Sequence, residues 1–311
     1  MKTVFLFPGQ GAQYPGMGKD LWEKSDAVKD LFRLASGVMG LDMKKLLFEG
    51  SAADLKTTDK AQGAITLVNL SAAAFLRDRG VVPGAAAGFS LGEYAALVTA
   101  GVIDAEAVFS LVKFRGEVME AASRALDTAE GPPGMTAVMG LDLPDVRDAL
   151  AAAGIADVYA ANYNSPVQTV LSGAAAALGR AEAALAAAGA RRCIRLAVSG
   201  PFHSPLLAQA RTAFEAELEK YSFADPALTV YSNVTGKPVA SGGEAKRLAG
   251  EQITSAVLWV DIEKNVKAAG CAGVLEAGPG TVLAGLWKAL FPEQPCLAAG
   301  TVEAILKISG Q

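Results

Sequence analysis

The sequence predicts an α/β protein in which strands and helices alternate along most of its 311 residues. Short apolar runs rich in strand-forming residues, such as residues 3–7, are followed by longer stretches with helical periodicity. The residues are 51% hydrophobic and only 19% charged, which is typical of a chain that buries a large core. A Gly-x-Ser-x-Gly pentapeptide, Gly88 to Gly92, stands where one strand turns sharply into a helix. These observations favour a layered α/β architecture.

The composition also excludes several classes of function. A formal net charge of −4 and a pI near 5.3 argue against general nucleic-acid binding, which requires a basic surface. The three cysteines, Cys193, Cys271 and Cys296, lie far apart and form no Cys-x-x-Cys pair. They indicate reduced thiols in a cytoplasmic protein rather than a disulfide framework or a zinc site.

No segment has the pattern of an export signal or a membrane anchor. The apolar run that ends at Pro8 is too short for a signal peptide. The most apolar later stretch, from Ala64 to Leu76, is interrupted by Asn69 and Ser71 and is shorter than a membrane span. We therefore expect a cytoplasmic protein that does not bind membranes.

The first part of the chain is expected to begin the main sheet. Residues 3–7 read as a buried parallel strand that Pro8-Gly9 ends. Ser90 then lies between a strand and a helix, as a nucleophile in such a turn requires. The elements expected here are strands over 3–7 and 82–89 and helices over 20–37, 63–79, 91–100 and 105–124.

A change of composition at Gly131-Pro132-Pro133-Gly134 indicates the start of a smaller unit. The pattern that follows is strand 135–140, helix 143–153, strands 158–161 and 169–172, helix 174–189 and strand 192–198. This β-α-β-β-α-β order is that of a ferredoxin-like unit. We expect an inserted subdomain over 130–197 and a core formed by 1–129 and 198–311. Short strands over 228–232, 273–276 and 296–299 complete the main sheet.

The only histidine in the chain, His203, is the natural candidate for a general base near neutral pH. A serine hydroxyl is a poor nucleophile until a base accepts its proton, and Ser90 needs such a partner. On its own, a single histidine is more often a turn residue or a satisfied buried ring. Together with the Gly-x-Ser-x-Gly turn, it predicts a Ser90–His203 pair.

Catalysis at Ser90 also requires N–H donors for the oxyanion that forms during acyl transfer. Leu91 follows the serine at the start of a helix, where backbone N–H groups have no partner within the helix. A second donor must come from another loop, and the glycine-containing loop 8–13 after the first strand is a candidate. Considered alone, such a loop is more often only a turn.

Five motifs, in this order, resemble those of one enzyme family. They are Phe7-Pro8-Gly9-Gln10-Gly11-Ala12-Gln13, Gly88-Phe89-Ser90-Leu91-Gly92-Glu93-Tyr94, Asn162-Tyr163-Asn164-Ser165-Pro166, Gly200-Pro201-Phe202-His203-Ser204 and Glu276-Ala277-Gly278-Pro279-Gly280. Their combination spans nearly the whole chain and resembles the malonyl-CoA:acyl carrier protein transacylases of bacterial fatty acid synthesis. The resemblance implies an α/β-hydrolase-like core with a parallel sheet and an inserted ferredoxin-like subdomain.

The resemblance also implies roles for individual residues. Ser90 would be the acylated nucleophile, and His203 would act first as base and then as acid. The backbone N–H groups of Gln10 and Leu91 would form the oxyanion hole. In this family a carbonyl rather than an acid orients the histidine, and the matching position here is Gln252 in Glu251-Gln252-Ile253.

Two further positions bear on the choice of substrate. Arg115 matches the arginine that holds the free carboxylate of the malonyl group; without the resemblance, a solvated helix residue paired with Glu117 or Asp104 is the simpler reading. Phe202, before the histidine, accompanies malonyl rather than methylmalonyl selectivity in related domains. Phe89 departs from the family, which most often has histidine before the nucleophile.

The reaction implied is transfer of a malonyl group from malonyl-CoA to the phosphopantetheine thiol of acyl carrier protein, with no metal or redox cofactor. The protein is expected to be a monomer. Arg191, Arg192 and Lys288 are candidates for docking the acidic carrier. Three alternatives remain: a transacylase of the same fold in a polyketide or malonate decarboxylase system, a serine thioesterase or other hydrolase, and a carrier-binding scaffold without activity.

Overall fold

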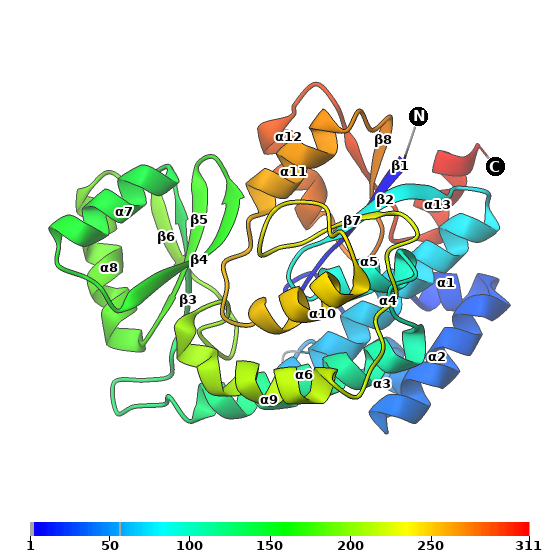
Figure 1. Cartoon of the computed structure of the whole chain (residues 1–311), viewed down its shortest axis with the longest axis horizontal. Helices are drawn as coiled ribbons and strands as arrows, with labels where there is room; N and C mark the ends of the chain where they lie inside the picture. The colour runs from blue at the N-terminus through cyan, green and yellow to red at the C-terminus, as the bar shows by residue number, and fades with distance from the viewer. Residues whose placement is uncertain (1–2, 56, 311) are drawn as a thin grey trace.

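The computed structural model describes residues 3–55 and 57–310 and contains a parallel sheet of five strands. The strand order is β7-β2-β1-β8-β9, and every neighbouring pair is parallel. Figure 1 shows that both ends of the chain contribute, since blue β1 lies beside orange β8. The strands are β1 (Thr3–Phe7), β2 (Pro83–Gly88), β7 (Thr229–Tyr231), β8 (Gly273–Glu276) and β9 (Cys296–Ala298).

Helices cover both faces of this sheet, as the continuous apolar run of β1 predicts for a strand buried on both sides. Phe5 and Phe7 join the core on one face, and Val4 and Leu6 join the core on the other. The second face is covered by α11 (Trp259–Ala268) and α12 (Val282–Leu290). On the first face, α5 (Gly92–Thr99) packs against β1 and β2. The core on this side also includes residues of α1 (Lys19–Lys24), α2 (Asp26–Met39), α3 (Met43–Glu49), α4 (Thr58–Asp78), α6 (Ala105–Arg124), α9 (Ala208–Leu218), α10 (Gly242–Glu251) and α13 (Val302–Ser309).

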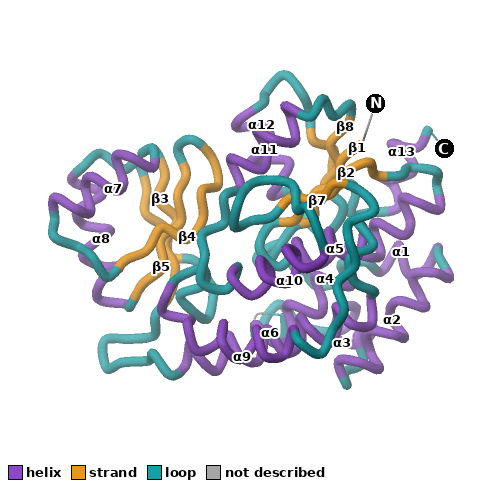
Figure 2. The backbone as a smooth tube through the Cα atoms, viewed as in Figure 1, coloured by secondary structure: helices purple, strands orange, loops and turns teal. Residues whose placement is uncertain are grey.

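The middle of the chain forms a second sheet, which Figure 2 shows as a separate group of strands. Its four strands are antiparallel in the order β4-β5-β3-β6, and two helices pack on it around a core of their own. This is the strand order of a ferredoxin-like unit and confirms the predicted fold class. Its elements are β3 (Gly134–Met139), α7 (Leu143–Ala152), β4 (Val158–Ser165), β5 (Gln168–Gly173), α8 (Ala175–Ala187) and β6 (Arg192–Arg195). They lie inside the expected insertion, whose limits at 130 and 197 stay a prediction.

Two expectations about individual elements are wrong. The helix expected over 20–37 is divided at Ser25, which has an extended backbone and whose Oγ accepts a hydrogen bond from the Val28 N–H at 3.3 Å. A serine in this position starts a new helix because it satisfies an N–H that otherwise lacks a partner. The strand expected over 192–198 ends at Arg195, because the chain then leaves the sheet and passes along a cavity.

Among the described residues, no helix combines the length and the hydropathy needed to cross a membrane.

A close contact between α5 and β1 generates a prediction for stability. A Cβ on Gly92 would lie 2.0 Å from the carbonyl oxygen of Phe7, which cannot move without disturbing the central strand. We expect Gly92→Ala to lower the free energy of unfolding by about 3 kcal/mol, the upper end for overpacking. Gly179→Ala in α8 is the matched control, because nothing lies within 4 Å of that position. It should raise stability by about 0.5–1 kcal/mol.

Urea denaturation of both variants beside the unchanged protein measures these differences. Equal stability of Gly92→Ala and the unchanged protein would contradict the contact.

Candidate active site

Ser90 lies in the turn between β2 and α5 with a left-handed backbone, at φ 50°. Residues other than glycine rarely adopt this conformation, so the surroundings must hold it. Asn233, after β7, accepts the Ser90 N–H on its Oδ1 at 2.6 Å and donates from Nδ2 to the Gly88 carbonyl oxygen at 2.6 Å. Gln252 Nε2 donates to the Ser90 carbonyl oxygen at 3.1 Å. Two amide side chains far away in the sequence therefore fix both backbone polar groups of this serine.

His203 lies in the loop between β6 and the 3-10 turn Pro205–Leu207, with a φ of 56°. Its Nε2 is 2.6 Å from Ser90 Oγ, and its Nδ1 is 2.9 Å from the backbone carbonyl oxygen of Gln252. Because a carbonyl oxygen only accepts, we assign the ring hydrogen to Nδ1 and the lone pair to Nε2. Burial, followed by the charge of Arg115, lowers the pKa of His203 to about 4. The imidazole is therefore neutral at pH 7 and able to accept a proton from the serine.

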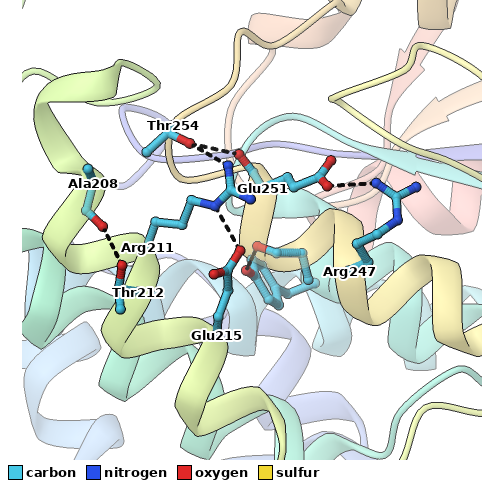
Figure 3. Close-up of polar contacts among 9 residues, drawn as sticks. Ala208, Arg211, Thr212, Glu215, Arg247, Glu251 and Thr254 are labelled. Carbon is cyan, nitrogen blue, oxygen red and sulfur yellow. Dashed lines mark hydrogen bonds and ion pairs between the residues drawn. The ribbon is translucent and has the colours of Figure 1, made fainter.

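The backbone of Gln252, at the end of α10, is held in place from α9. In Figure 3, Arg211 of α9 extends to Thr254, and its Nη1 donates to Thr254 Oγ1 at 3.3 Å. Thr254 Oγ1 in turn donates to the Glu251 carbonyl oxygen at 3.4 Å. These contacts tie the turn that contains Gln252 to a neighbouring helix, and so they position the carbonyl group that orients His203.

Arg115 is 2% exposed, which excludes the reading of a solvated helix residue. Its Nη1 donates to Gln62 Oε1 at 2.9 Å and its Nη2 to Gln252 Oε1 at 3.1 Å. The guanidinium also lies over the ring of Tyr94, 5.5 Å from the centroid. Burial lowers the pKa of Arg115, but a guanidinium keeps its proton in proteins. The result is a buried positive charge whose two hydrogen-bond acceptors are neutral amides.

A buried carboxyl group, Glu93, lies beneath this cluster. Its Oε2 accepts hydrogen bonds from Gln252 Nε2 at 2.6 Å and from the Asn233 N–H at 3.1 Å. Burial raises the pKa of Glu93 to about 7, although both hydrogen bonds and the Arg115 charge act in the opposite direction. Glu93 therefore interacts with the residues that hold the serine as well as with the guanidinium.

Several of these supporting residues have no role that the sequence predicts. Glu93 follows the Gly-x-Ser-x-Gly turn, Asn69 interrupts an apolar run, and no motif contains Gln62 or Asn233. Asn69 Nδ2 donates to the Pro8 carbonyl oxygen at 2.9 Å and so holds the loop after β1. The usable signal was a polar residue within an apolar helix, since such residues need a buried partner.

A cavity of about 440 Å³ opens onto Ser90, His203 and Arg115. The cavity lies between the two bodies of the fold, because each contributes part of its wall. From the core come residues including Gln10, Phe89, Leu91, Leu283 and Leu286, and from the four-stranded sheet come Met135, Ala137, Asn162, Asn164, Gln168 and Val170. The segment 196–198, which leaves β6 early, also lines it. All residues expected at the site except Gln252 line this cavity, and Gln252 lies behind it.

Gln10 and Leu91 flank the serine from two different loops. Leu91 is the residue that precedes α5, so its N–H is among those that the helix leaves without an internal acceptor. A Cβ on Gly9 would lie 2.4 Å from the carbonyl oxygen of Phe89, which shows how closely the loop after β1 passes the turn. The arrangement brings two backbone segments to the same end of the cavity as the Ser90 hydroxyl.

Two phenylalanines shape the remaining wall. Phe202 is 6% exposed, and its carbonyl oxygen accepts a hydrogen bond from Ser172 Oγ at 2.5 Å. Phe89 packs edge-on against Trp259, with ring centroids 5.3 Å apart. Phe89 thus makes this side of the cavity apolar.

The candidate docking residues are exposed. Arg191 precedes β6 and Arg192 is its first residue, while the segment 196–198 that follows this strand lines the cavity. Lys288 is on α12, whose Val282 lines the cavity. All three cysteines are half-buried free thiols. Within residues 3–55 and 57–310, no group of three or more histidine, cysteine or acidic side chains is arranged to hold a metal ion.

Comparison with known proteins agrees with this geometry. Residues 4–299 match the family described as acyl transferase domain. The malonyl CoA-acyl carrier protein transacylase of Bacillus subtilis is 36% identical over 307 residues, which cover 98% of this chain and 95% of that protein.

Solved structures of related proteins resemble this chain in both fold and sequence. An acyl carrier protein S-malonyltransferase from Vibrio cholerae has a TM-score of 0.93 at 34% identity, covering 99% of this chain and 100% of the other. A malonyl-transacylase in complex with its type II PKS acyl-carrier protein has a TM-score of 0.94 at 33% identity, covering 100% and 99%. With this similarity in fold and sequence over almost its full length, the chain belongs to the acyl transferase domain family and, within it, to the malonyl CoA-acyl carrier protein transacylases.

Proposed function

We propose that this chain transfers a malonyl group from malonyl-CoA to the phosphopantetheine thiol of an acyl carrier protein, through an ester on Ser90, for fatty acid synthesis. The observation that carries the proposal is the buried guanidinium of Arg115 in the same cavity as the Ser90–His203 pair. A neutral acyl chain gains nothing from a buried cation, whereas a malonyl group has a free carboxylate. The names of the relatives support the same assignment.

In the first half-reaction, Ser90 Oγ attacks the thioester carbonyl carbon while His203 Nε2 accepts the hydroxyl proton. The carbonyl oxygen becomes negatively charged, and the N–H groups of Gln10 and Leu91 stabilise it. The carbon–sulfur bond then breaks, and the CoA sulfur leaves with the proton from His203. This sequence produces the malonyl ester of Ser90 and free CoA without a metal or redox cofactor.

In the second half-reaction, the carrier's thiol loses its proton to His203 and its sulfur attacks the ester carbonyl. The bond to Ser90 Oγ breaks, and the proton returns to that oxygen. Between the two steps the ester must be protected from water. The mostly apolar walls that include Phe89, Val170 and Phe202 support this requirement.

Two side chains set the preference for the acyl group. Each terminal nitrogen of Arg115 has two hydrogens and uses one for its amide contact, so the second pair can bind the two oxygens of a carboxylate. Phe202 lines the same cavity, and we expect its ring to restrict the space for a substituent next to the thioester carbonyl. One methyl group changes such discrimination by only about 1–3 kcal/mol.

The carrier would dock at the mouth of the cavity through Arg191, Arg192 and Lys288, since carrier proteins of this type are acidic. A polyketide carrier is the second candidate partner. The malonyl-transacylase solved with a type II PKS acyl-carrier protein favours it, because that protein covers the whole chain at 33% identity.

The first test of the proposed function is the mass of the intact protein after brief exposure to malonyl-CoA. We expect an increase of one malonyl group that is absent in Ser90→Ala, and its loss on adding a carrier with a free phosphopantetheine thiol. Acetyl-CoA should give a much smaller adduct. Continuous CoA release without an acceptor thiol would instead indicate a hydrolase, and no adduct with no release would indicate a scaffold.

Replacing Arg115 should change which acyl group is accepted. We expect Arg115→Ala to lower kcat/KM for malonyl-CoA by about 10²-fold or more, because removing one partner of a buried charge pair costs about 3–5 kcal/mol. The value for acetyl-CoA should fall much less, because that substrate loses only the support that Arg115 gives to Gln252. Arg124→Ala on the same helix is the control, because that side chain is 72% exposed and pairs only with Glu120 at the surface. A parallel loss for both acyl groups would contradict the carboxylate contact.

The low pKa of His203 makes a prediction about pH. Since the imidazole must be neutral to accept the serine proton, kcat/KM for acylation should rise with pH, reach half its maximum near pH 4 and be level between about pH 5 and 6.5. Stopped-flow acylation after pH jumps between 3.5 and 6.5 measures this profile, with circular dichroism to verify that the protein stays folded. A midpoint near the ordinary histidine value would show that the imidazole is not desolvated.

A further inference from the structure

A single carboxamide separates the two oppositely charged groups beneath Ser90. Arg115 Nη2 donates to Gln252 Oε1 at 3.1 Å, and Gln252 Nε2 donates to Glu93 Oε2 at 2.6 Å. Both ionisable side chains are buried, at 2% and 3% exposure. In such surroundings charges interact more strongly than in water, so the state of one depends on the state of the other. Without substrate, the positive and negative charges balance at a pH where Glu93 is ionised.

Binding of a malonyl group changes this balance, and the inference therefore rests on the proposed function. The substrate's carboxylate brings a second negative charge to a site with one guanidinium. Two carboxylates near one cation cannot both stay ionised without cost. The substrate carboxylate would bind Arg115 directly, whereas Glu93 is held by the neutral donors Asn233 N–H and Gln252 Nε2. Glu93 is consequently the carboxylate that loses its charge more easily.

The other titratable groups near Glu93 are poorer acceptors of a proton. Arg115 of α6 is already protonated, and burial raises the pKa of Tyr94, so that this neighbour on α5 is neutral. His203 faces the same guanidinium from the loop before α9, and its pKa is lowered to about 4. The pKa of Glu93, at about 7, is closest to neutral pH.

We propose that malonyl-CoA binds together with one proton from the solvent, which Glu93 takes up as the substrate carboxylate contacts Arg115. The proton adds to a carboxylate oxygen of Glu93 and is released again when the malonyl group leaves on the carrier. Glu93 is thereby a specificity-determining residue that acts through Gln252 and Arg115. Acetyl-CoA brings no carboxylate and draws no such proton. The preference for malonyl over acetyl therefore falls as pH rises above 7.

Isothermal titration calorimetry in buffers of different ionisation enthalpy tests this proposal. The protein is Ser90→Ala, which can bind acyl-CoA without being acylated, and the ligands are malonyl-CoA and acetyl-CoA. Because both ligands contain the same CoA, the difference between them isolates the malonyl carboxylate. We expect malonyl-CoA to take up about one proton more than acetyl-CoA at pH 8 and almost none at pH 6. Its Kd should rise by about tenfold per pH unit above pH 7.

The double variant Ser90→Ala, Glu93→Gln identifies the group that takes up the proton. Glutamine keeps the size and an acceptor oxygen, so Kd for malonyl-CoA should become constant between pH 6 and 8 and the additional proton should disappear. A proton that persists would belong to another group, such as His203, and would overturn the proposal. Preferential binding of malonyl-CoA with no additional proton in the Glu93-containing protein would overturn it as well, whether or not the double variant folds. Equal binding of the two ligands at pH 6 would instead overturn the proposed function, and this inference with it.

Discussion

The buried side chain and carbonyl of Gln252 join the nucleophile, the base and the guanidinium into one unit. The backbone oxygen fixes the His203 ring, Nε2 holds the Ser90 carbonyl group, and Oε1 accepts from Arg115. Every one of these contacts is made in surroundings where an unpaired polar group is costly. The groups therefore cannot shift independently, which is the preorganisation that charge stabilisation in a reacting site requires. Glu93 completes the unit from below, since it binds the same amide.

The parallel sheet explains why segments so distant in sequence meet here. In such a sheet the carboxyl ends of the strands share one edge, and ligands bind beyond that edge. The loop containing Gln10 follows β1, Ser90 follows β2 and Asn233 follows β7. The four-stranded sheet supplies the opposite wall of the cavity, and His203 arrives in the loop that returns from it to the core. The insertion thus contributes a wall of the cavity, and the segment that returns from it to the core carries the base.

The parts of the fold and the site that could be predicted from the sequence are those with a local sequence pattern. The strand over 3–7 and the helix over 105–124 have the observed limits because their apolar periodicity is regular and their caps are nearby. Ser90 and His203 were found from a turn motif and a unique residue type, whereas Gln252 depended on the family resemblance. Glu93 and Asn233 were missed because each partner lies 140 residues away from the other, and no local pattern indicates such a contact.

The same charge balance bears on how the single histidine is sufficient, since Phe89 precedes the nucleophile. Phe89 and Trp259 leave that side of the serine apolar, so His203 alone must accept the proton. Its pKa is lowered first by burial and second by Arg115, and only the second cause responds to substrate. Under the proposed function, a malonyl carboxylate on Arg115 would lie in the cavity that His203 also lines, whereas Glu93 lies behind Gln252, so replacing the charge of Glu93 by that of the substrate makes the imidazole a stronger base. An acetyl group leaves the guanidinium charge in place. Selectivity then arises in the chemical step as well as in binding, because the carboxylate that identifies the substrate also strengthens the base that activates the serine.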